Sequence, residues 1–168
     1  MTHPFITYLV SLAESENRGP LAALRRGLGQ PPGTVAETYR YVVPWLPDNP
    51  YPAQEAAYYL VASLFAFHSK STSEGNMGAH LARTRSPERS DDALERRFTA
   101  LLSAHPEDLP VYLRQAVSYL KSKDEVPVNW SQLVEDLQNW GRADRRVQKR
   151  WAGTFWRAHQ PAAETTNS

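Results

Sequence analysis

AQEAAYYLVASLFAF, residues 53–67, is the stretch that decides the fold, because it is apolar on nearly every face of a helix. A helix with a single apolar stripe lies at a protein surface, whereas a helix that is apolar all round is buried. The stretch is shorter than the roughly 18 apolar residues that a membrane span needs. We therefore expect a central helix of a soluble bundle, with the other elements packed around it.

The segments on both sides of this helix also have helical periods. Apolar residues recur at helical spacing, as at Phe5, Leu9 and Ala13, and no segment has the alternation of a β-strand. Thr34 and Glu37 have the spacing of a capping box, which predicts that a helix begins there. Prolines interrupt the pattern between segments. We predict an all-α protein with about eight helices: 5–13, 21–28, one from residue 34 onward, 53–67, 90–103, 110–120, 130–140 and 142–158.

A break at 84–90 divides the chain into two predicted bundles of unequal size. We expect an N-terminal helical lobe over residues 1–85 and a C-terminal helical lobe over residues 86–160, each a small bundle. The final residues, 161–168, read PAAETTNS, and a short polar terminus of this kind predicts a disordered tail.

Composition excludes several classes of protein. Among 168 residues, 19 Lys and Arg face 18 Asp and Glu, which excludes a bulk polycation and an acidic tail. There is no Cys, so disulfide frameworks, cysteine-ligated zinc sites and thiol nucleophiles are excluded. The N-terminus lacks the basic region and cleavage site of a signal peptide. We therefore expect a cytoplasmic protein.

The residues of common catalytic sites are not arranged for catalysis. The five His residues include no pair at the spacing of a helical metal site. Phosphate-binding glycine loops and nucleophile elbows are also lacking. Glu135 and Asp136 are adjacent and point about 100° apart on a helix, so they do not converge on one ion. We expect no enzymatic activity, no metal and no cofactor.

Cations without a local counter-charge are a more informative feature. Arg accounts for 15 of the 19 basic residues, and Arg suits bidentate contact with phosphate or carboxylate, although GC-rich coding produces the same bias. Ion pairs are expected for Arg96 with Asp92 and for Arg40 with Glu37. Four arginines have no acid at the four-residue spacing on their own helices: Arg25, Arg26, Arg97 and Arg114.

The predicted last helix concentrates positive charge. Residues 141–157 contain six basic residues and one acid, Asp144. Arg142, Arg146 and Arg150 would stack at four-residue spacing, and Arg145 would stack with Lys149. A solvated basic face, or pairing with acids on other helices, explains such a run as well as a polyanionic partner does. If the partner is nucleic acid, we expect phosphate contacts without sequence specificity, since no base-reading motif is present.

An ordered set of blocks resembles one known family. The blocks are LAALRRGLG (21–29), TYRYVVPWLP (38–47), YYLVASLFAFH (58–68), NMGAHLAR (76–83), LERRFTALL (94–102), LPVYLRQAVSYL (109–120), VNWSQLVEDLQNWG (128–141) and VQKRWAGTFW (147–156). Together they resemble the CasB family, the small subunit of the type I-E CRISPR Cascade complex, over nearly the whole chain to residue 160.

The resemblance implies a function that the residues alone do not. CasB proteins are non-catalytic and all-helical, with two lobes, and form a head-to-tail homodimer within Cascade beside the backbone and large subunits and the crRNA. They stabilise the R-loop by holding DNA, chiefly the displaced strand, on a basic surface. The alternative is a structural adaptor that docks acidic protein partners without binding nucleic acid. The predicted nucleic-acid-binding residues are Arg25, Arg26, Arg83, Arg96, Arg97, Arg114, Arg142, Arg145, Arg146 and Lys149, with Arg83 beside a loop that varies among members and Lys149 taken from the basic stack.

Overall fold

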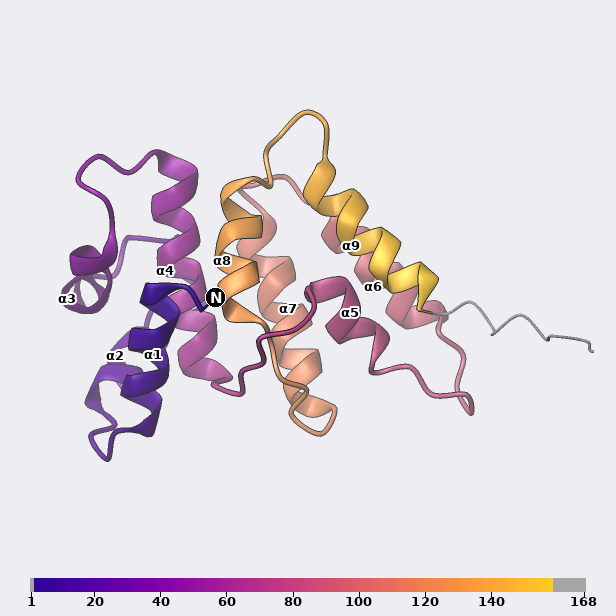
Figure 1. Cartoon of the computed structure of the whole chain (residues 1–168), viewed down its shortest axis with the longest axis horizontal. Helices are drawn as coiled ribbons and strands as arrows, with labels where there is room; N and C mark the ends of the chain where they lie inside the picture. Colours follow the sequence, from indigo (N-terminus) through magenta and orange to yellow (C-terminus); the bar gives the residue numbers. More distant parts are fainter. Residues whose placement is uncertain (1, 159–168) are drawn as a thin grey trace, which may run out of the picture.

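The computed structural model describes residues 2–158, and the regular structure in that range is helical (Figure 1). The prediction of an all-α protein is confirmed, with nine α-helices and two 3₁₀ turns among the described residues. The predicted tail at 161–168 lies outside them. The elements are α1 (Pro4–Glu14), α2 (Gly19–Arg25), η1 (Ala36–Thr38), α3 (Tyr39–Val42), η2 (Val43–Trp45), α4 (Pro52–Phe67), α5 (Met77–Ala82), α6 (Asp92–Leu102), α7 (Leu109–Ser122), α8 (Trp130–Gln138) and α9 (Arg146–Arg157).

Helix α4 is buried along most of its length, as its sequence predicts. Pro52 stands in its first turn, where the missing N–H costs nothing, and Val61, Leu64 and Phe65 are fully buried. The helix packs most closely against α8 and α2 (Figure 1). No helix within residues 2–158 is long and apolar enough to cross a membrane.

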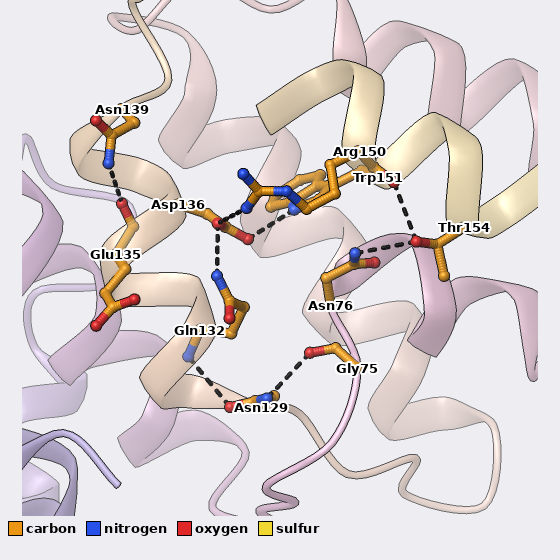
Figure 2. Close-up of polar contacts among 10 residues, drawn as sticks. All are labelled: Gly75, Asn76, Asn129, Gln132, Glu135, Asp136, Asn139, Arg150, Trp151 and Thr154. Carbon is orange, nitrogen blue, oxygen red and sulfur yellow. Dashed lines mark hydrogen bonds and ion pairs between the residues drawn. The ribbon is translucent and has the colours of Figure 1, made fainter. Parts of the chain in front are cut away.

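A second close packing joins α5 to α9. Gly78 on α5 lies against the backbone of α9, and a Cβ at this position would overlap the carbonyl group of Trp151. Glycine therefore permits the two helices to approach more closely than any other residue would. Asn76 caps α5 by accepting the N–H of Ala79, and its amide donates to Thr154 Oγ1 on α9 at 3.1 Å (Figure 2).

The packing of α4 against α8 and that of α5 against α9 each join segments on opposite sides of residue 86. Helices α4 and α5 precede this position, whereas α8 and α9 follow it. The buried apolar residues form one core that runs from Phe5 to Phe155. The division into lobes at 1–85 and 86–160 stays a prediction.

The structure corrects one predicted helix start and adds one helix that was not predicted. Thr34 does not cap a helix: its hydroxyl donates to the carbonyl of Pro31 at 2.6 Å, and Val35 is extended before η1 begins. The hydroxyl closes the preceding proline turn, in which Gly33 has a φ of 81°, so it does not serve the next helix. Helix α5 was not predicted, although Asn76 before an apolar run is a capping signal.

Candidate nucleic-acid interface

Arg25 and Arg26 lie at the C-terminal end of α2. Leu21 and Leu24 anchor the helix in the core, which leaves the two arginines exposed. Cations at this end interact favourably with the helix dipole. Neither arginine forms an ion pair within residues 2–158.

Arg114 reaches from α7 to the turn that follows Arg26. Its Nη1 lies 2.8 Å from the position that a Cβ on Gly29 would occupy, and Gly29 has a φ of 77°. A groove of about 400 Å³ separates this turn from α7, and Arg114 and Gln115 line it on the α7 side. Arg114 is exposed and has no ion pair in the described part of the chain. The fold therefore brings Arg114 to the end of the helix that carries Arg25 and Arg26.

Arg97 lines a second groove, between α6 and α7. Its guanidinium carbon lies 5.7 Å from the ring centroid of Tyr119 on α7. Gln115 lines both this groove and the one beside Gly29, so the two adjoin along α7. Arg97 and Arg114 therefore line two grooves that adjoin at Gln115.

Arg96 points away from Arg97, into a shallow depression on the other face of α6. The depression is also lined by Asp92 and Glu95, yet no ion pair joins Arg96 to either acid. The expected Arg96–Asp92 pair is therefore not formed. Nor does Arg40 pair with Glu37, since its guanidinium lies 5.3 Å from the Tyr41 ring centroid.

The basic stack predicted at 142–150 is corrected by the start of α9. The helix begins at Arg146, and Arg145 before it has a left-handed backbone conformation, with φ 53° and ψ 34°. Arg145 Nη2 donates to the carbonyl of Leu102 at the end of α6, at 2.6 Å. The Arg142–Arg146–Arg150 and Arg145–Lys149 stacks therefore do not form, because the turn before the helix directs the first members elsewhere.

Arg142 is held by the only acid nearby in sequence. Its Nη2 lies 3.2 Å from Asp144 Oδ2, and hydrogen bonding to Arg142 lowers the pKa of the Asp144 carboxyl. Asp144 Oδ1 also accepts the N–H of Arg146, which satisfies one donor of the first turn of α9. Arg142 is therefore less available to a ligand than Arg146 and Lys149, which are exposed and form no ion pair within residues 2–158.

Arg150 is partnered by a buried acid on α8. Its Nη1 lies 3.4 Å from Asp136 Oδ1, and Asp136 also accepts bonds from Trp151 Nε1 at 2.8 Å and Gln132 Nε2 at 2.9 Å (Figure 2). Burial raises the pKa of Asp136, and these three donors partly offset the rise. The contact fixes α9 against α8. Glu135 points away from this cluster (Figure 2), so the two adjacent acids do not converge.

Arg83 and Arg85 follow each other closely but differ in role. Arg83 caps α5 and is exposed. Arg85 was not predicted to matter, and its side chain is only 10% exposed: it lies 3.9 Å above the Phe155 ring and forms ion pairs with Asp91 and Glu95. No spacing on its own segment signals these contacts, because Phe155 is 70 residues away. Arg85 is a structural residue.

The arrangement is suited to binding anions. Within residues 2–158, no group of three or more His, Cys, Asp or Glu residues is placed to hold a metal ion. Exposed arginines without ion pairs line or flank two adjoining grooves, and guanidinium groups bind phosphate in a bidentate manner. Arg97 and Arg114 line the two grooves, and Arg25 and Arg26 end the helix before the Gly29 turn that borders one of them; we call these four residues the groove arginines. Other exposed candidates lie elsewhere: Arg96 on α6, Arg145 in the turn before α9, and Arg146 and Lys149 on α9.

Fold and site together define an all-helical protein with exposed arginines beside two adjoining grooves. Comparison with known proteins is more specific. The chain belongs to the family of CRISPR-associated protein Cse2, whose family model matches residues 20–156. This is the CasB family, the non-catalytic small subunit of the type I-E Cascade surveillance complex.

The similarity to individual relatives extends over most of the chain. CRISPR-associated protein Cse2 of Thermus thermophilus is 35% identical over 139 residues, which are 82% of this chain and 78% of the relative. The crystal structure of CasB from Thermus thermophilus superimposes with a TM-score of 0.79 at 30% identity, covering 90% of this chain and 95% of that one. A chain of a CRISPR RNA-guided surveillance complex gives a TM-score of 0.78 at 28% identity, covering 92% and 90%.

Proposed function

We propose that this subunit holds nucleic acid in the Cascade complex without reading its sequence. Its ligand is DNA, chiefly the strand displaced when crRNA pairs with the target, and the contact stabilises the R-loop. The proposal includes a head-to-tail homodimer, contact with crRNA and with the backbone and large subunits, and action in the cytoplasm. The observation that carries it is that Arg97 and Arg114 line two adjoining grooves and that Arg25 and Arg26 directly precede the turn that borders one of them. None of the four has an ion pair in the described part of the chain.

Phosphate binding accounts for this arrangement in physical terms. Contacts to backbone phosphates position a protein on a strand and do not depend on the bases. If each groove arginine neutralises one phosphate of a single strand, log K falls with log salt at a slope of about −2.8. Four phosphate contacts alone give weak binding by the free subunit at physiological salt, and affinity would then depend on the rest of the complex.

The test compares two triple variants of equal charge change. The site variant replaces Arg25, Arg26 and Arg114 with Ala, whereas the control replaces three exposed arginines elsewhere, Arg18, Arg40 and Arg89. Fluorescence anisotropy with labelled single-stranded DNA is measured from 25 to 300 mM salt. We expect the site variant to lose about 2 units of salt slope, and the control to keep the slope of the unmodified protein.

The same pair of variants separates the proposal from its alternative. Equal slopes in both triple variants would contradict a DNA site at the end of α2. A protein that binds acidic subunits but no DNA at low salt would be a structural adaptor. Urea unfolding of each variant serves as the folding control, and R-loop formation by reconstituted Cascade tests the site variant in the assembled complex.

A further inference from the structure

We propose that the groove between α6 and α7 receives an unpaired nucleobase of the bound strand. The inference rests on the proposed function, since it specifies how the same surface treats the bases of a strand whose phosphates it holds. It predicts a preference for unpaired over paired nucleotides, because a paired base is stacked within the duplex and does not reach a groove of this kind.

The groove has the size and lining of a site for a flat apolar ring. Its volume is about 420 Å³, within the range of about 300–1,000 Å³ that is usual for small-molecule sites. Leu94, Phe98 and Leu101 of α6 form an apolar floor, and the rings of Tyr112 and Tyr119 form the α7 wall, half-buried. Aromatic side chains of this kind stack with any base, which gives affinity without sequence preference.

Exposed polar side chains line the groove along α7. Gln115, Ser118 and Ser122 are exposed along α7 and offer donors and acceptors to the edge of a base. Among residues 2–158, no carboxylate lines the groove, and Arg97 is the one charged residue that does. Lys123, next after Ser122, places its Nζ 5.5 Å from the centroid of Tyr119.

Charge decides between a nucleotide and a protein side chain as the occupant. Arg97 and Lys123 both lie beside the Tyr119 ring, and neither has an ion pair within residues 2–158. An apolar side chain from another protein would fill the floor and leave both cations without a counter-charge. A nucleotide brings a flat ring for the groove and a phosphate for the cations.

Continuity with the groove beside Gly29 supplies the path of the strand. Gln115 lines both grooves, and Arg114 stands one residue before it, beside Gly29. A strand whose phosphates contact Arg114 therefore passes the mouth of the α6–α7 groove. Arg97 is placed to hold the phosphate that flanks the inserted base.

The experiment uses two single strands that carry the same phosphates. Anisotropy at low salt compares a labelled thymidine oligonucleotide with an abasic oligonucleotide of equal length, using the full chain. We expect the thymidine strand to bind at least about 5-fold more tightly, because stacking contributes roughly 1 kcal/mol or more per base. Equal affinity for the two strands would overturn the base site and leave the proposed function intact, whereas binding of neither strand would overturn the proposed function.

Variants locate the preference in the groove. Tyr119→Leu keeps a helix-forming apolar residue but removes the ring, so the thymidine strand should bind only as well as the abasic strand. Tyr119→Phe keeps the ring and should keep the preference. Tyr39→Leu, at an exposed tyrosine on α3, is the matched control and should also keep it. A preference that survives in Tyr119→Leu and in Tyr112→Leu would overturn the assignment to this groove.

Discussion

His80 makes the stability of the fold depend on pH. It lies on α5 with 2% of its surface exposed, and its Nε2 accepts the backbone N–H of Asn129 at 2.9 Å. A protonated ring could not accept this bond. Burial, with a smaller contribution from the nearby Arg83, lowers the pKa of His80 from 6.5 to about 4. The native state therefore requires the neutral ring.

The size of the effect follows from the two pKa values. The unfolded chain takes up a proton below pH 6.5, whereas the folded chain does so only near pH 4. Stability from the neutral ring is thus present above pH 6.5 and is lost as the pH falls from 6.5 towards 4. Between pH 7 and pH 5, linkage gives a loss of about 2 kcal/mol in the free energy of unfolding.

Urea unfolding, followed by far-ultraviolet circular dichroism at pH 7 and pH 5, measures this loss. His80→Gln is the reference variant, because the Gln side-chain oxygen can accept the Asn129 N–H and does not titrate. All other titrating groups are common to both proteins and cancel in the difference. We expect the unmodified protein to lose about 2 kcal/mol more than the variant. An equal loss in both proteins would refute the assignment to His80.

Substitutions at three positions test the contacts that hold α9. Gly78→Ala should lower the free energy of unfolding by about 1–3 kcal/mol, because the new Cβ overlaps the Trp151 carbonyl; an unchanged melting temperature would contradict this close approach. Arg85→Ala should cost about 2–4 kcal/mol in thermal unfolding, and Arg85→Lys should not restore it, because Lys lacks the planar group that covers Phe155. Asp136→Ala should destabilise more than Asp136→Asn, by about 1–3 kcal/mol in urea, since Asn keeps an acceptor for the Trp151 N–H. Equal costs for the two Asp136 substitutions would show that this bond contributes nothing.

Helix periods predicted most of the elements, with errors at their ends. The all-round apolar pattern of 53–67 identified α4 to within one residue of its start, at Pro52. The error was larger at the last helix, which begins at Arg146 rather than at residue 142. Apolar spacing alone did not reveal the turn at 142–145, since this turn depends on Arg145 reaching the Leu102 carbonyl.

Local spacing separated the candidate arginines only in part. Arg25, Arg26, Arg97 and Arg114 have no acid nearby on their helices, and the structure forms no ion pair with any of them among residues 2–158. The same reasoning failed for Arg150, whose partner Asp136 lies 14 residues earlier on another helix. Pairs between helices depend on how those helices pack, which residue spacing does not describe.

The sequence by itself determined the helical class, the buried position of α4 and the set of arginines without a partner on their own helix. These properties depend on the α-helical repeat of 3.6 residues, which any segment carries within itself. Tertiary structure decided which cations stay exposed, the neutral state required of His80 and the existence of the α6–α7 groove. Each of these depends on side chains from separate helices meeting in space, as Arg97 meets Tyr119, and only the packing of the whole core brings them together.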